Sequence, residues 1–177
     1  MSHAITLEEI IDFLLSASMF CDLDPTELAE IVQIMQVQRM RADQYVFRQG
    51  DAGDAWYVLY DGTAEVVKES ELGSSHIAEL APTSCFGEMA VLDGSTRSAT
   101  IRTVTPCVAF RFPRTRFQEL LDKNNLAAYK LVYQMALVLA ARQRNTTTRV
   151  AGLIGSSQSD VYLEQLGPIV HEASLAE

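Results

Sequence analysis

Long apolar segments are missing from this chain of 177 residues. No run reaches the about 18 consecutive apolar residues that a membrane-spanning helix requires. The first residues carry Glu8, Glu9 and Asp12 between short apolar steps, which is unlike a secretory signal peptide. We therefore expect a soluble, cytoplasmic protein. Because 48% of its residues are hydrophobic, it has material for a sizeable core in a single domain with appendages.

Cysteine and histidine are scarce, with three of each. Cys21, Cys85 and Cys107 are scattered without a CxxC spacing, so we expect neither a disulfide framework nor a zinc site. The histidines are equally isolated, which leaves no metal cluster and no catalytic triad. A phosphodiesterase would need paired metal ligands or an activated nucleophile. The sequence therefore predicts no enzymatic activity and no bound metal.

Positive charge is in deficit, since 14 Lys and Arg stand against 23 Asp and Glu and the net charge is −9. This charge opposes binding to the phosphate backbone of nucleic acid and to anionic lipid. The last stretch, 150–177, contains no Lys or Arg and has four acidic residues. It is also shorter than the roughly 45 residues of a helix-turn-helix unit with its supporting helix. We expect no nucleic-acid partner and no membrane partner.

One stretch, 86–101, reads FGEMAVLDGSTRSATI and combines the groups of an anion-binding site. Gly87 lets the backbone approach a ligand closely, and the residues after it start a short helix whose free N–H groups attract negative charge. The Arg97 guanidinium matches a phosphate through two parallel hydrogen bonds, whereas Glu88 would repel phosphate and suits a vicinal hydroxyl. A ligand that offers both groups to one small site is a compact nucleotide, and a cyclic nucleotide suits this spacing.

This stretch resembles the phosphate-binding cassette of cyclic nucleotide-binding domains, a family that includes bacterial catabolite activators and protein kinase A regulatory subunits. The residues that carry the resemblance are Phe86-Gly87-Glu88-Met89-Ala90 and Arg97-Ser98-Ala99-Thr100. The resemblance extends over roughly residues 12–148. It implies a stand-alone, bacterial-type member of the family without a DNA-binding domain.

The resemblance implies a role for each of these polar groups. Glu88 would accept the ribose 2′-hydroxyl, helped by the N–H of Gly87. Arg97 would hold the cyclic phosphate together with Ser98 and Ala99. In the alternative interpretation, the cassette (86–100) is a surface loop in which Glu88 and Arg97 only pair with each other, which stabilises an exposed loop very little.

The periodicity of the chain predicts an α+β fold, an antiparallel, jelly-roll-like β-roll with N-terminal helices and a long C-terminal helix. Capping-box patterns at Thr6 and Asp24 predict two helices. From Met40 the period changes to alternation, Asp61-Gly62 is a hairpin signal, and 68–75 is typical of a solvated loop. Many short strands indicate a closed roll. The predicted parts are an N-terminal helical bundle (1–37), the β-roll with the cassette (38–113), C-terminal helices including a dimerisation helix (114–149) and an acidic tail (150–177).

The long helix, expected from about Asn125 to Arg149, has two apolar sides. We expect the side with Tyr129, Val132, Tyr133, Ala136 and Ala140 to pack on the β-roll. The other side follows the 4-3 spacing of a seam between partner helices, with Leu131, Met135, Val138, Arg142, Asn145 and Arg149. This seam predicts a parallel homodimer. In the alternative, the protein is a monomer whose helix folds back under the tail.

Ser98 bears on which base is bound. Its hydroxyl can donate to the cyclic phosphate, as the resemblance to the catabolite activators implies, or accept from the exocyclic amine of guanine. Serine suits the first role because it lacks the methyl group that would aim the hydroxyl. We therefore predict cAMP rather than cGMP as the ligand. The amino group of adenine would still need a partner, for which the reachable candidates are Arg142, Gln143, Asn145 and Thr146.

Two functions of different classes fit these features. In the first, the protein is a sensor in which nucleotide binding shifts an equilibrium of the C-terminal helix and so signals to a downstream protein or a dimer mate. In the second, it is an interaction scaffold that has the fold but uses no nucleotide. Glu88 and Arg97 favour the sensor, because a scaffold has no need of an Arg and a Glu in one small loop.

Overall fold

The computed structural model describes residues 5–71 and 73–156. The chain divides into two compact units, Met1–Ala136 and Leu137–Glu177. The first unit contains the whole β-roll and the cassette. Of the acidic tail, 157–177 lies outside the described residues.

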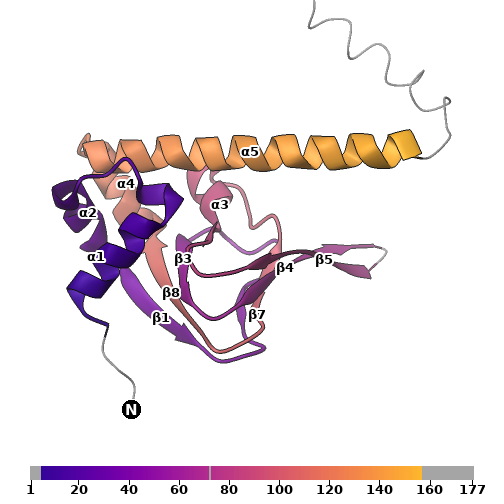
Figure 1. Ribbon diagram of the computed structural model, residues 1–177, viewed down its shortest axis with the longest axis horizontal. Coiled ribbons are helices and arrows are strands. Elements are labelled where there is room, and N and C mark those ends of the chain that lie inside the picture. Colours follow the sequence, from indigo (N-terminus) through magenta and orange to yellow (C-terminus); the bar gives the residue numbers. More distant parts are fainter. Residues whose placement is uncertain (1–4, 72, 157–177) are drawn as a thin grey trace, which may run out of the picture. The chain divides into compact units, whose positions relative to one another are not determined.

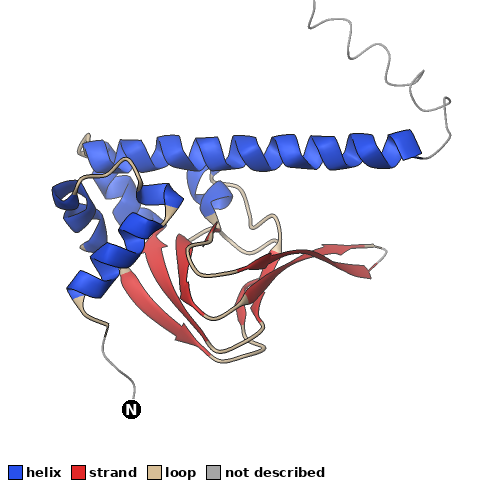
Figure 2. Ribbon diagram, in the orientation of Figure 1, coloured by secondary structure: helices blue, strands red, loops and turns tan. Residues whose placement is uncertain are grey.

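Eight strands in the described residues form two antiparallel sheets (Figure 2). They are β1 (Gln36–Met40), β2 (Tyr45–Phe47), β3 (Ala55–Asp61), β4 (Ala64–Ser70), β5 (Gly73–Leu80), β6 (Cys85–Phe86), β7 (Thr100–Thr103) and β8 (Cys107–Pro113). One sheet has the order β1-β8-β3-β6 and the other β2-β7-β4-β5. The predicted α+β fold with a β-roll is confirmed.

Helices precede, interrupt and follow the strands (Figure 1). They are α1 (Leu7–Ser16), the 3-10 helix η1 (Ser18–Phe20), α2 (Pro25–Val32), α3 (Glu88–Asp93), α4 (Arg114–Asp122) and α5 (Leu126–Ser156). Both predicted capping boxes are present, with Thr6 paired to Glu9 and Asp24 paired to Glu27. Each box satisfies N–H groups that the first helical turn leaves without an intrahelical partner.

Successive side chains of β3 point to opposite faces of the sheet and contribute to two apolar layers. Tyr57 points into the roll, where its ring stacks on that of Phe86 at 5.2 Å between centroids. Trp56 points the other way and stacks on Phe112 at 4.1 Å, with Phe117 of α4 at 5.9 Å. The helices α1, α2 and α4 lie beside this sheet in Figure 1. Trp56 is fully buried, so it packs the core.

The segment 68–75 is mostly strand, which corrects the expected solvated loop. β4 continues to Ser70 and pairs antiparallel with β5 from Gly73. Every residue of β5 except Leu80 is exposed, so this hairpin has little of the apolar alternation by which a strand is recognised in a sequence. The predicted Asp61-Gly62 turn also differs, because Asp61 belongs to β3 and Gly62 alone has a positive φ, +89°.

The sides of α5 are reversed with respect to the expectation. Leu131 and Met135, predicted to form a seam with a partner helix, are fully buried within the first unit. Tyr129 and Tyr133, predicted to pack on the β-roll, are 47% and 61% exposed. The dimer seam predicted through Met135 is therefore wrong for this fold, because that side chain is already covered by its own chain.

Polar pairs join the start of α5, and the residue before it, to α2 and to the segment before α2. The Lys130 ammonium lies 2.7 Å from the Glu27 carboxylate. The side chain of Asn125 donates to Glu30, and that of Gln134 donates to Asp22. Lys130 and Gln134 directly precede Leu131 and Met135 on α5, so their pairs favour the burial of this side of the helix. The helix also continues past Arg149 to Ser156, and no helix among the described residues is long and apolar enough to cross a membrane.

Candidate functional site

The cassette is a turn, a short helix and the start of a strand, all within the first unit. Gly87 follows β6 with φ +79°, a left-handed conformation that glycine adopts without strain. It precedes α3, whose first residue is Glu88 and whose end is marked by Gly94, also left-handed. The chain then returns through Arg97 to β7. The turn thus brings the main chain of Gly87 against the side chain of Arg97, ten residues further on.

The guanidinium of Arg97 is buried, with only 2% of the residue exposed. One terminal nitrogen donates to the carbonyl of Gly87 at 2.8 Å. The other donates to the carbonyl of Ala55 at 2.7 Å and to the Asp54 carboxylate at 3.0 Å. The ring of Phe47 lies against the same guanidinium, 4.1 Å from its central carbon. Both terminal nitrogens are therefore held in place by the β-roll itself.

The third nitrogen of Arg97, Nε, is buried and has no hydrogen-bond partner. An unsatisfied buried donor costs about 1 to 3 kcal/mol, and more when the group is charged. Such a donor, part of a fixed cation, fits an anionic acceptor such as a phosphate oxygen. The residues present therefore suit the phosphate group that the cassette predicts.

Glu88 is buried as well, with 1% of the residue exposed, and lies in the first turn of α3. Arg97 forms an ion pair with Asp54. Because Glu88 and Arg97 are both buried, the alternative of an exposed pair on a surface loop does not describe this structure.

Asp54 connects the cassette to the neighbouring sheet. Its Oδ1 accepts from Arg97, and its Oδ2 accepts from Arg111 of β8 at 2.7 Å. Arg111 also donates to the side-chain oxygen of Gln36 at 2.8 Å. Burial alone would raise the pKa of Asp54, but the hydrogen bond from Arg111 and the charges of Arg111 and Arg97 lower it below the ordinary value. This carboxylate therefore remains charged between two guanidinium groups.

The other cassette residues fall into two groups. Phe86, Ala90 and Thr100 are buried. The hydroxyl of Thr100 is used within the fold, because it accepts from the N–H of Gln49 at 2.9 Å and donates to a Glu69 carboxylate oxygen at 3.0 Å. These three positions support the cassette by packing and hydrogen bonding.

Met89 and Ser98 form the exposed group, with half-buried Ala99 beside them. The hydroxyl of Ser98 lies 3.8 Å from the Met89 sulfur, and its main-chain carbonyl accepts from Lys68 at 2.6 Å. The Ser98 side chain is therefore accessible to a ligand at the point where the chain leaves Arg97.

Comparison with known proteins agrees with this geometry. Residues 37–124, which include the whole cassette, match the family model of the cyclic nucleotide-binding domain. The chain belongs to the cyclic nucleotide-binding domain family.

Two relatives match this chain over a part of their length. The chain is 31% identical over 105 residues to a cGMP-dependent protein kinase of Drosophila melanogaster, covering 59% of this chain and 9% of the kinase. It is 29% identical over 103 residues to a cAMP-dependent protein kinase regulatory subunit of Yarrowia lipolytica, covering 58% of this chain and 26% of the subunit. The chain thus spans about a quarter or less of the length of these relatives.

A cyclic nucleotide-binding domain from Methylobacillus flagellatus shares the fold. Its crystal structure gives a TM-score of 0.77 at 21% identity and covers 90% of this chain and 91% of its own. At that identity the likeness concerns the architecture alone.

The four residues predicted to meet the base belong to the second unit. Arg142, Gln143, Asn145 and Thr146 are exposed on α5. The hydroxyl of Thr146 donates to the carbonyl of Arg142 at 3.0 Å, a bond internal to the helix. Their part in binding the base stays a prediction.

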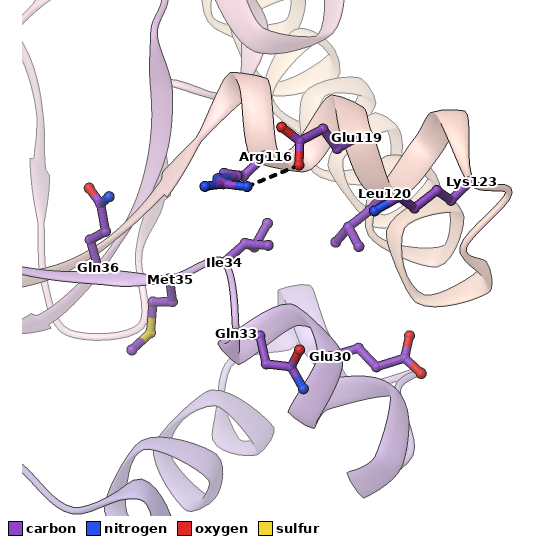
Figure 3. A pocket seen from close by; sticks show the side chains of 9 residues that line it. All are labelled: Glu30, Gln33, Ile34, Met35, Gln36, Arg116, Glu119, Leu120 and Lys123. Atoms are coloured by element: carbon purple, nitrogen blue, oxygen red, sulfur yellow. Dashed lines mark hydrogen bonds and ion pairs between the residues drawn. The ribbon is translucent and has the colours of Figure 1, made fainter.

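A groove with a volume of about 770 Å³ lies between α2 and α4 (Figure 3). It is lined by Glu30, Gln33, Ile34, Met35, Gln36, Arg116, Glu119, Leu120 and Lys123. None of these residues belongs to the cassette. Among the lining residues, Arg116 and Glu119 are already paired at 3.2 Å, which leaves the groove with little unbalanced charge of either sign.

Sequence reasoning missed three groups that hold Arg97. They are the Asp54 carboxylate, the carbonyl of Ala55 and the ring of Phe47. The available signal was the glycine-bearing turn 50–54, which ends in Asp54 immediately before a strand. An acidic residue at the end of such a turn is a candidate partner for a nearby arginine.

The packing of Gly87 against Arg97 leads to a stability prediction. A Cβ at position 87 would lie 2.8 Å from a terminal nitrogen of Arg97 and 3.3 Å from the Phe47 ring, so Gly87→Ala must displace the guanidinium. Gly50 is the matched control, because its φ of +88° is similar and no atom lies within 4 Å of an added Cβ. Each alanine should cost about 1 kcal/mol for its backbone conformation. We expect Gly87→Ala to lower the free energy of unfolding in urea by at least about 1 kcal/mol more than Gly50→Ala. Equal losses would contradict the packing.

Proposed function

We propose that this chain binds a cyclic nucleotide in the cassette and acts as a sensor of its concentration. The observation that carries the proposal is the unpartnered, buried Nε of Arg97. The other two nitrogens are occupied by Gly87, Ala55 and Asp54, so Nε is the donor left for a cyclic phosphate. A bound phosphate would offset the cost of burying this charged donor.

The remaining polar groups of the cassette suit the other parts of the ligand. Glu88 accepts the ribose 2′-hydroxyl with help from the N–H of Gly87, and Ser98 and Ala99 assist Arg97 at the phosphate. A free phosphate would leave the Glu88 carboxylate facing an anion, whereas a ribose hydroxyl donates to it. A net charge of −9 repels anions in general, so a local cation is needed for any phosphate to bind.

We further propose that cAMP is preferred over cGMP and that the signal passes through α5 to a downstream protein. Ligand binding can shift α5 only by the difference in affinity between its two arrangements. Arg142, Gln143, Asn145 and Thr146 are the proposed contacts to adenine. The acidic composition supports a cytoplasmic protein whose partners are other than nucleic acid or a membrane surface.

Calorimetric titration with cAMP tests the binding site. Arg97→Ala should weaken binding about a hundredfold, on the order of 3 kcal/mol, because both the charge-assisted hydrogen bond from Nε and the attraction of the cation for the phosphate are lost. This variant also leaves the Ala55 and Gly87 carbonyls without their donor and should unfold more easily. Arg97→Lys is therefore measured beside it, because it retains the positive charge but lacks Nε, and it should also bind poorly.

Arg102→Ala is the matched control for this titration. It removes the same charge from an ion pair on β7, with Glu65 at 2.7 Å, and should bind as the unmutated protein does. Glu88→Ala should lose less affinity than Arg97→Ala. Folded Arg97→Lys that binds cAMP as tightly as the unmutated protein would show that the nucleotide does not use this arginine.

Competition between the two cyclic nucleotides tests the choice of base. We expect cAMP to displace a labelled nucleotide at lower concentration than cGMP, by a modest 1 to 2 kcal/mol, about 5- to 30-fold, since one hydrogen bond separates them. The Ser98→Ala variant should lose affinity for both nucleotides alike if its hydroxyl faces the phosphate. A selective loss for cGMP would show instead that Ser98 reads the base.

Homodimerisation is proposed through the exposed side of α5. Leu126, Tyr129 and Tyr133 follow a 3-4 spacing and are 63%, 47% and 61% exposed, so they give α5 an apolar stripe that a second copy could cover. Tyr129→Glu with Tyr133→Glu would place like charges across a two-fold axis. In light scattering we expect a dimer for the unmutated protein and a monomer for this variant. An unmutated protein that is monomeric at tens of micromolar would refute the dimer.

A further inference from the structure

Arg111 is a cation of the β-roll that lies outside the cassette. It lies on β8, and its side chain is 22% exposed. One terminal nitrogen donates to Asp54 Oδ2 at 2.7 Å and the other to the Gln36 side chain at 2.8 Å. Its guanidinium is therefore fixed at both ends, by a carboxylate and by an amide oxygen.

Two arginines and a hydrogen bond from its own main chain orient the Asp54 carboxylate. Its side chain is 63% exposed, and its two oxygens are divided between two arginines, Oδ1 to Arg97 and Oδ2 to Arg111. The main chain at this position is held separately, because the carbonyl of Asp54 accepts from the N–H of Arg114 at 2.8 Å. The direction in which the carboxylate faces Arg97 therefore depends on Arg111.

We propose that Arg111 is a positioning residue for the anion site, acting on Arg97 through Asp54. By occupying Oδ2 it leaves Asp54 a single oxygen for Arg97, so the carboxylate contacts one terminal nitrogen and leaves Nε unpartnered. The inference rests on the proposed function, because the anion is the phosphate of the cyclic nucleotide. Gln36 has the supporting part of holding the Arg111 guanidinium from the other side.

Two effects of losing Arg111 act in the same direction. With Oδ2 released, Asp54 is free to turn and pair with Arg97 through both oxygens, which is the preferred geometry of an Arg–carboxylate pair. The carboxylate also loses a second cation, so a greater share of its negative charge falls on Arg97. Both effects make Arg97 a weaker partner for phosphate.

The test is a double-mutant cycle read by calorimetric titration with cAMP. Arg111→Met, which keeps the apolar stem and removes the charge, should weaken binding about tenfold. Arg102→Met is the matched control, since it removes the same charge from a strand residue that pairs with Glu65 instead of Asp54, and it should change binding less than about twofold. In the Asp54→Asn background, Arg111→Met should have no further effect.

A second measurement needs no ligand and separates this inference from the proposed function. The Nε–H group of Arg97, assigned in a nitrogen-proton NMR spectrum by its loss in Arg97→Lys, should shift in Arg111→Met and keep its position in Arg102→Met.

Arg111→Lys should restore part of the affinity for cAMP, because an ammonium can still pair with Oδ2 of Asp54. An unmutated protein that fails to bind cAMP would overturn the proposed function and this inference together. If it binds cAMP, either of two results would overturn the inference. One is an Arg97 Nε–H signal that does not move in Arg111→Met. The other is a loss of cAMP affinity in Arg111→Met that is equally large in the Asp54→Asn background.

Discussion

The Arg97 guanidinium is held by two main-chain carbonyls and one carboxylate, and much of the site follows from this arrangement. Burying a cation is costly unless its donors are satisfied, and here two of its three nitrogens are satisfied by Gly87, Ala55 and Asp54. The remaining donor, Nε, is left without a partner. Because the other two nitrogens are already fixed, part of the cost of ordering this arginine for an anion is met by folding.

The β-roll provides the carbonyls and the carboxylate from separate parts of the chain. Ala55 begins β3, and Gly87 follows β6, which pairs with β3 through Tyr57 and Phe86. Trp56, the neighbour of Ala55, is locked into the layer below the helices by its stack on Phe112. The apolar packing of the sheet therefore fixes the main-chain atoms that position Arg97.

Features set by neighbouring residues could be predicted from the sequence, and those set by distant residues could not. The capping boxes at Thr6 and Asp24 and the cassette around Gly87 are local patterns, and the predicted fold class followed from periodicity. Asp54 meets Arg97 across 43 positions because the fold brings their two loops together, so the turn 50–54 marks Asp54 as a candidate but does not identify its partner. Likewise, α5 has two apolar sides, and the Lys130–Glu27 pair between α5 and α2 favours the burial of one of them.

The central claim is that the buried Nε of Arg97 is the donor that a cyclic phosphate completes. A crystal structure of the protein with cAMP tests it most directly. The account predicts a phosphate oxygen within hydrogen-bond distance of Nε, about 2.7 to 3.2 Å. It also predicts that the bonds from Arg97 to Gly87 and Ala55 are retained and that the ribose hydroxyl lies on Glu88. A nucleotide bound with its phosphate elsewhere, or with Nε still unpartnered, would contradict it.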